Sequence, residues 1–144
     1  MDSEAKIVVL AGATGGLGKL IAHALLDEPD VTLRALVRPG SRVKAAPLAD
    51  RGAELIEVAL DEPEAVDDVM TGAYSVVSAV QGDDEVIIKY QARMLQSAAR
   101  TGVRRFIPSD FSYNIFGMAG ICPACRGDQG RRRGRPRPGR VLPR

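Results

Sequence analysis

Three glycines near the start of the chain have a spacing that suits phosphate binding. Gly12, Gly15 and Gly18 lie in the segment "VVLAGATGGLGKL", residues 8–20, between an apolar run and a helix-like pattern. In a strand-to-helix turn the first glycine permits a sharp bend, the second lets a diphosphate approach the backbone, and the third lets helix and strand pack closely. The exposed N–H groups and the positive helix end then bind the anion. This context predicts a nucleotide-binding turn, with a merely structural Gly-rich turn as the alternative.

A basic residue stands where the choice between NAD and NADP is usually made. Arg38 follows the second apolar run, 20 positions after Gly18, and Arg42 and Lys44 lie close to it in sequence. A carboxylate there would accept a hydrogen bond from the adenosine ribose but would repel a 2′-phosphate. A guanidinium binds a phosphate through two charge-assisted hydrogen bonds. The sequence therefore favours NADP(H) over NAD(H), unless Arg38 is only a solvated charge at a strand end.

Short apolar runs alternate with helix-like patterns over the first 116 residues. The expected strands are Ile7–Leu10, Val31–Val37, Glu54–Leu60, Ser75–Val80 and Arg105–Pro108. The expected helices are one that begins after the glycines and stops before Pro29, and three over Arg42–Arg51, Glu62–Met70 and Asp83–Arg100. Such alternation predicts an α/β fold, a doubly wound, Rossmann-like parallel sheet in the order 3-2-1-4-5. Its ligand should lie at the carboxyl ends of the first and fourth strands, where the winding reverses.

Helical spacing also predicts which side chains of two helices face the sheet. For the first helix the expected buried face is Leu17, Leu20, Ile21, Ala24 and Leu25. For the long helix it is Ile88, Gln91/Ala92, Leu95 and Ala99.

These residues resemble the NmrA-like and isoflavone-reductase-like group of atypical short-chain dehydrogenases/reductases over residues 5–116. Four segments carry the resemblance: Gly12-Ala-Thr-Gly-Gly-Leu-Gly18, Leu36-Val-Arg38, Ser75–Val80 and Gly102-Val-Arg-Arg-Phe-Ile-Pro-Ser-Asp-Phe111. The resemblance implies NADPH binding by the glycine turn and Arg38, with the end of the fourth strand beside the cofactor. The implied cofactor-binding residues are Gly12, Thr14, Gly15, Gly16, Leu17, Gly18, Arg38, Arg42, Ser78, Val80 and Gln81.

The catalytic residue that the resemblance implies has no counterpart here. In reductases of this group a lysine on the helix after the "SDF" strand acts as acid or base, yet no lysine follows Lys89. The Tyr-x-x-x-Lys pair of ordinary short-chain dehydrogenases is also absent from the sequence. Ser109, Asp110 and Tyr113 are expected near the cofactor, but none is assigned as a general acid. Whether the chain is an active enzyme therefore stays open.

The last 28 residues differ in composition from the rest. Residues 117–144 hold 8 Arg, six Gly, four Pro and one acid, Asp128, whereas the remaining residues have a net charge of −5. Such a segment is expected to be disordered, and a frameshifted gene would also produce it. The Cys122-Pro-Ala-Cys125 pair lacks two further ligands for zinc, so no metal site is expected. Arg133-Gly-Arg-Pro136 resembles a minor-groove-binding motif, but nucleic-acid binding is the weaker interpretation.

The sequence thus predicts a nucleotide-binding domain over residues 1–116, C-terminally incomplete, followed by the basic tail. The acidic N-terminus is no signal peptide and no run is long enough for a membrane span, so a cytoplasmic protein is expected. The predicted function is that of an NADP(H)-binding oxidoreductase fragment that is catalytically incomplete. By resemblance, its substrates would be quinones, enones or phenylpropanoid-like molecules. The alternative is a non-enzymatic dinucleotide-sensing regulator whose basic tail contacts nucleic acid.

Overall fold

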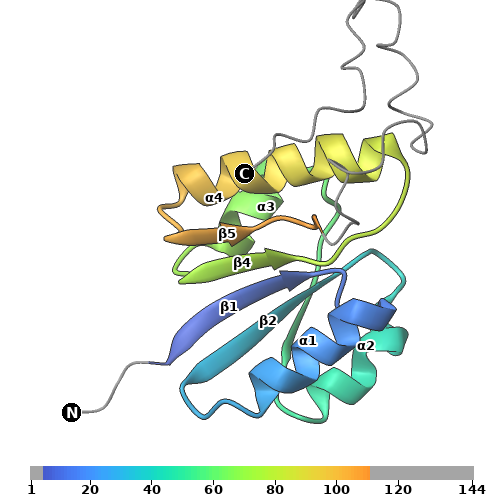
Figure 1. Cartoon of the computed structure of the whole chain (residues 1–144), viewed down its shortest axis with the longest axis vertical. Coiled ribbons are helices and arrows are strands. Elements are labelled where there is room, and N and C mark those ends of the chain that lie inside the picture. The colour runs from blue at the N-terminus through green and yellow to red at the C-terminus, as the bar shows by residue number, and fades with distance from the viewer. Residues whose placement is uncertain (1–4, 111–144) are drawn as a thin grey trace, which may run out of the picture. The chain divides into compact units, whose positions relative to one another are not determined.

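The computed structural model describes residues 5–110 of the 144-residue chain. These residues form a five-stranded parallel sheet in the order β3-β2-β1-β4-β5, with helices on both of its faces (Figure 1). The strands are β1 (Lys6–Ala11), β2 (Val31–Val37), β3 (Glu54–Glu57), β4 (Ser75–Ser78) and β5 (Arg105–Ile107). The fold class and strand order predicted from the sequence are confirmed. The expected β3 and β4 extended two or three residues too far, into the loops at the carboxyl edge.

The connecting segments are the helices that the sequence predicts. They are α1 (Gly16–Leu26), α2 (Arg42–Ala49), α3 (Pro63–Met70), the π-helical turn η1 (Glu85–Tyr90) and α4 (Gln91–Arg100). Pro63 occupies the first position of α3, where proline has no helical hydrogen bond to lose. α1 ends three residues before Pro29, which could not continue it.

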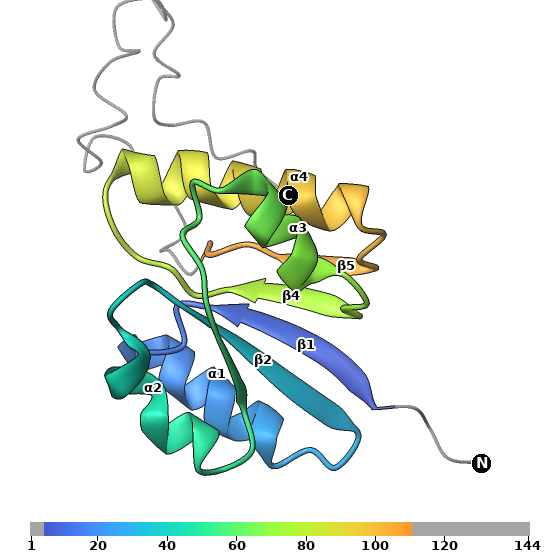
Figure 2. The ribbon, with the colours of Figure 1, turned by 180° about the vertical axis from the view of Figure 1, so that it is seen from behind.

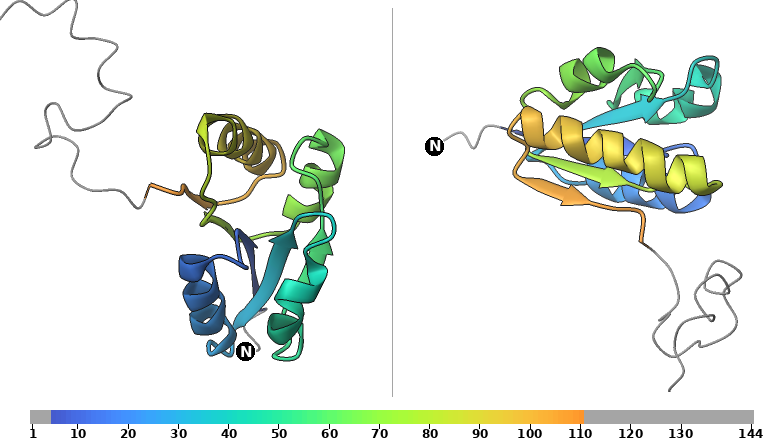
Figure 3. Two further views of the ribbon diagram at one scale, coloured as in Figure 1. Left: turned by 90° about the vertical axis from the view of Figure 1, so that its right-hand side faces the viewer. Right: turned by 90° about the horizontal axis from the view of Figure 1, so that it is seen from above.

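Two apolar cores lie on opposite faces of the sheet. Figures 2 and 3 show the helices that cover them, α1 and α2 on one face and α3 and α4 on the other. β1 contributes to both, because Val8 and Leu10 face α1 and α2 while Val9 and Ala11 face α3 and α4. Alternate residues of a strand point to opposite faces, so a central strand buried on both sides reads as one continuous apolar run. This is why β1 is so easily found in the sequence.

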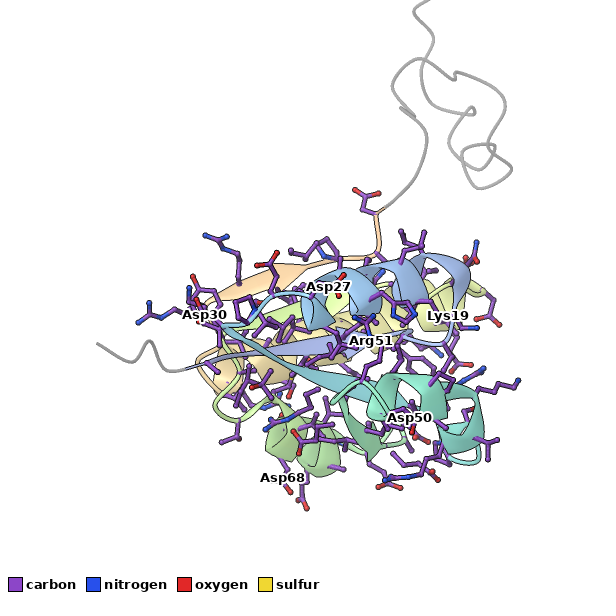
Figure 4. The ribbon with its side chains drawn as sticks, turned by 90° about the horizontal axis from the view of Figure 1, so that it is seen from below. Lys19, Asp27, Asp30, Asp50, Arg51 and Asp68 are labelled. Atoms are coloured by element: carbon purple, nitrogen blue, oxygen red, sulfur yellow. The ribbon has the colours of Figure 1, made fainter. Side chains whose placement is uncertain are left out.

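Polar contacts join the layers at their exposed edges. Arg51, which follows α2, forms an ion pair with Asp27 at the end of α1 (2.5 Å between Nη2 and Oδ1; Figure 4). Arg34 on β2 donates to Glu54 on β3, to the carbonyl of Val69 in the last turn of α3, and to the carbonyl of Thr71 just after α3. The first contact joins α1 to α2, and the second ties α3 to the sheet, both at a distance from the glycine turn.

The buried face of α1 differs from the prediction. Leu20 is 69% exposed and Leu17 is 42% exposed, whereas Gly18 and Ala22 are buried against the sheet. The reason is the close approach at Gly18, where a Cβ atom would overlap the carbonyl of Gly12. A helix that packs through its smallest residues turns its larger ones outward. Ala24 is exposed as well, while Ile21 and Leu25 are partly buried as expected.

The buried face of α4 was also predicted wrongly. Ile88 is 63% exposed and Leu95 is 51% exposed, and the face toward α3 instead presents Met94, Ser97 and Ala98. The prediction is off by one position along the whole helix, because Ile87, Gln91, Met94 and Ala98 keep α-helical spacing on the less exposed face. One physical reason is that the buried Ser97 has a polar partner, Asp67 of α3, which a rule based on hydrophobicity cannot anticipate.

On the α1 side of the sheet, β5 is the least covered strand within residues 5–110. Ile107 is 42% exposed there, although Val77, its neighbour on β4, is buried. The predictions for residues 117–144, and the expected end of the domain at residue 116, lie outside the described residues.

Candidate dinucleotide-binding site

The β1–α1 turn offers three unpaired backbone amides. Gly12 has φ +83°, and the amide of Gly15 donates to the carbonyl of Gly12 at 3.0 Å, which closes the turn. The amide of Lys19 makes the first helical bond, to Gly15 at 2.9 Å. Within the described chain, the intervening amides of Gly16, Leu17 and Gly18 have no backbone partner, as at any helix start. Since Gly15–Leu17 are exposed, an anion can reach the positive end of α1.

The glycines of the turn divide into two groups by their surroundings. A Cβ atom at Gly12 would lie 2.5 Å from the carbonyl oxygen of Ala79, and one at Gly18 would overlap Gly12 itself. These two glycines are therefore required by the packing of the protein. At Gly15 the nearest atom would be 3.3 Å away, and Gly16 has open space around it. Their lack of side chains leaves room on the solvent side, where a diphosphate would lie.

β2 ends beside this turn, so Arg38, the next residue, lies at the same edge of the sheet. Arg38 is exposed, and among residues 5–110 no hydrogen bond or ion pair holds its side chain. Arg42, at the start of α2, donates to the carbonyl of Leu55 on β3 at 3.3 Å, so part of its guanidinium is already engaged. Arg38 is therefore the better placed of the two to receive a phosphate.

A carboxylate that sequence reasoning missed lies against the segment after β2 that carries Arg38. Glu57, at the end of β3, accepts a hydrogen bond from the amide of Gly40 at 3.1 Å. The β2–β3 register places Glu57 opposite Val37, the residue just before Arg38. No motif could have found it, because only the pairing of the two strands brings it there.

The end of β4 lies on the other side of the turn. Ser78 is fully buried, and its Oγ has no hydrogen-bond partner in the described chain. The Ser78 hydroxyl is therefore closed to solvent in this structure. Val80 is partly buried and Gln81 is exposed, and a Cβ atom at Gly12 would also lie 2.9 Å from the amide nitrogen of Val80. The structure thus brings Val80 to the glycine turn. Thr14, which belongs to the turn, is partly buried.

No described side chain at this edge has an evident proton-transfer role. Ser109 donates to the carbonyl of Val80 at 2.7 Å, and Asp110 is the last described residue. Tyr74 precedes β4 at the opposite edge of the sheet, where Lys6 lies 5.4 Å from its ring centre. Tyr113 is outside the described residues.

The ionisable pair with displaced pKa values lies between α3 and α4. The hydrogen bond from Arg100 lowers the pKa of Asp67 most, and the hydrogen bond from Ser97 lowers it further. The same hydrogen bond with Asp67 raises the pKa of Arg100. Arg100 ends α4 just before β5 begins, so the pair lies toward the edge opposite the glycine turn. Its role is to join two helices. Within residues 5–110 no cluster of three metal-binding side chains occurs, and no helix is long and apolar enough to cross a membrane.

Residues 4–117 match the NmrA-like family. The chain belongs to this family. A curated relative, "NmrA-like family domain-containing oxidoreductase ptmS" of Penicillium ochrochloron, is 28% identical over 118 residues, which cover 76% of this chain and 35% of the relative. The resemblance stated from the glycine turn and the "RFIPSDF" segment is thereby confirmed.

Solved structures agree with the fold. AtPrR2 with NADP+ and (+)pinoresinol is 28% identical with a TM-score of 0.69, and the match covers 83% of this chain and 41% of AtPrR2. Isoflavone reductase shares the fold, with 20% identity and a TM-score of 0.71 over 85% of this chain and 42% of that protein. The chain therefore spans about a third to two fifths of the length of these relatives.

Proposed function

We propose that this chain is the NADP(H)-binding part of an NmrA-like reductase. The observation that carries the proposal is the exposed β1–α1 turn, with three unpaired amides and with Gly16, around which a side chain would have open space. In a doubly wound sheet the ligand lies where the strand order reverses, here between β1 and β4. The turn therefore stands where a diphosphate would be bound. Gly12 and Gly18 shape it, while Gly15, Gly16 and Leu17 would face the ligand.

Arg38 is the residue that would select NADP(H) over NAD(H). It is exposed at the end of β2, its side chain has no partner among residues 5–110, and a related structure holds NADP+. Arg38→Asp would remove a charge-assisted hydrogen bond and add repulsion. The free energy of NADPH binding should become less favourable by about 1.5–3 kcal/mol, which weakens the affinity roughly ten- to 150-fold.

Fluorescence titration of the 144-residue chain with NADPH and NADH tests this assignment. NADH affinity should change little or improve in the Arg38→Asp variant. Arg105→Asp makes the same charge change at the far edge of the sheet, where β5 begins, and should leave both affinities near those of the wild type. Equal losses of NADPH and NADH binding in Arg38→Asp would show that Arg38 acts structurally and would leave the NADP assignment without support.

The substrate class follows only from the family. AtPrR2 was solved with (+)pinoresinol, and ptmS is named an oxidoreductase; by analogy we infer a reductase of quinones, enones or phenylpropanoid-like molecules. Hydride transfer also needs a substrate pocket and a proton donor, and the latter commonly contributes about 10²–10⁴ in rate. No described residue at the site is assigned as that proton donor, and the sequence has no lysine after Lys89. We expect the 144-residue chain to bind NADPH without oxidising it.

Turnover and binding are measured side by side to test this. NADPH oxidation is followed with a panel of quinones, enones and aromatic ethers, at NADPH concentrations that saturate the chain in the titration. Robust turnover would contradict the proposal and would assign the chemistry to Ser109, Asp110 or Tyr113. The regulator alternative depends on the tail, which lies outside the described residues. Salt-sensitive DNA binding that is lost on cutting after Phe116 would favour it.

A further inference from the structure

A line of hydrogen bonds joins three segments at the carboxyl edge of the sheet. The hydroxyl of Ser109, two residues beyond β5, donates to the carbonyl of Val80 at 2.7 Å. The amide of Ser109 donates to Oε1 of Gln91 at 2.6 Å, and Nε2 of Gln91 donates to the carbonyl of Ile87 at 3.0 Å. Ser109 thus connects the segment after β4 to the start of α4. All three contacts involve partly buried groups, where hydrogen bonds are less open to competition from water.

These contacts begin where the backbone ladder ends. The last paired residues of β4 and β5 are Val77 and Ile107. Beyond them the two strands have no mutual backbone pairing, and the side chain of Ser109 supplies the connection instead. On the other side, Ala79 is held to β1 by a backbone bond to Ala11 at 2.9 Å.

The segment that Ser109 holds packs directly on the glycine turn. A Cβ atom at Gly12 would lie 2.5 Å from the carbonyl oxygen of Ala79 and 2.9 Å from the amide nitrogen of Val80. Residues 79–80 therefore lie between the turn on one side and Ser109 on the other. A change in the position of this segment alters the shape of the site at the turn.

The direction of the bound dinucleotide follows from the strand order. Arg38 follows β2, on one side of β1, and β4 lies on the other side. If Arg38 receives the adenosine 2′-phosphate and the turn after β1 receives the diphosphate, the nicotinamide half must extend toward the end of β4. Residues 79–81 would then lie beside that half and away from the adenosine.

We propose that Ser109 and Gln91 are positioning residues that hold residues 79–81 in place for the nicotinamide half of NADP(H). This inference rests on the proposed dinucleotide function. Ser109→Ala would leave the Val80 carbonyl without its partner, and Gln91→Leu would release the amide of Ser109. Either change should weaken the nicotinamide half of the site and leave the adenosine half intact.

The experiment compares a whole dinucleotide with its adenosine half. Affinities for NADPH and for 2′,5′-ADP are measured by calorimetry on the 144-residue chain. Ser109→Ala and Gln91→Leu should each weaken NADPH about tenfold, the equivalent of one net hydrogen bond, and change 2′,5′-ADP affinity less than twofold. Ser109→Thr, which keeps the hydroxyl, should restore most of the NADPH affinity.

Thr101→Ala is the matched control, because Thr101 also donates its hydroxyl to backbone carbonyls, those of Ser97 and Ala98, at the opposite end of α4. It should change neither affinity. Equal loss of NADPH and 2′,5′-ADP binding in Ser109→Ala and Gln91→Leu would overturn the proposal, and so would unchanged NADPH binding. A wild-type chain that binds neither ligand would instead contradict the proposed function itself.

Discussion

The glycine at the bend of the β1–α1 turn allows a quantitative test of the packing argument. Gly12 has φ +83°, and a side chain there would meet the backbone of Ala79 and Val80. A left-handed conformation costs a non-glycine residue about 1–2 kcal/mol, and overpacking typically costs a further 1–3 kcal/mol or so. Gly12→Ala should therefore lower the free energy of unfolding by about 2–5 kcal/mol.

The conformational part of this cost can be measured separately at Gly72. This glycine has φ +76°, but a Cβ atom there would have nothing within 4 Å. Gly72→Ala should therefore lower the free energy of unfolding by only about 1–2 kcal/mol. The difference between the two variants isolates the collision of Gly12 with the segment after β4.

Urea unfolding followed by circular dichroism gives both free energies. NADPH affinity is measured on the same variants at urea-free conditions where each is folded. Gly72→Ala should bind NADPH as the wild type does, while Gly12→Ala should bind it poorly because the turn has moved. Equal loss of stability in the two variants would refute the argument that Gly12 is required by close packing.

Three further predictions follow from single contacts. Gly15→Ala should lower the free energy of unfolding by less than about 1 kcal/mol. It should nevertheless weaken NADPH binding at least roughly tenfold, because the new methyl group would occupy the place of the diphosphate. Unchanged NADPH binding would show that Gly15 is not part of the site. Glu57→Gln should tighten NADPH about two- to fivefold by removing an anion beside the proposed 2′-phosphate site, with NADH unchanged. Glu54→Gln, on the same strand, is its control, and a gain in both variants would indicate only a net-charge effect. Arg100 lowers the pKa of Asp67, so the contribution of this carboxylate to stability should be present above its unfolded pKa and lost as the pH falls through the lower, folded value. The stability difference between wild type and Asp67→Asn should therefore shrink on acidification below about pH 4, and a difference independent of pH would contradict the ion pair.

Most of the fold could be predicted because its signals are local. β1 and β2 read as buried strands, and the glycine spacing, the proline at the start of α3 and the proline after α1 mark the ends of elements within a few residues. Parallel strands joined by helices then leave few possible arrangements. The expected strand order was correct for this reason.

The orientation of the helices could not be predicted in the same way. Leu20 and Leu95 look like core residues in a helical projection, yet both are more than half exposed. The close contact of Gly18 with Gly12 sets the rotation of α1 about its axis, and the contact of Ser97 with Asp67 favours the observed face of α4. Neither effect can be seen from the apolar pattern of one helix.

The sequence by itself determined the alternation of strands and helices, the glycine turn and the position of Arg38 after β2, since each depends on residues that are neighbours in the chain. Only the tertiary structure decided that Glu57 contacts Gly40, 17 positions away, and that Ser109 contacts Val80, 29 positions away. These contacts depend on which strands lie side by side and where their pairing stops. A residue's type states what it can bond to, but the packing of distant segments decides which partner is within reach.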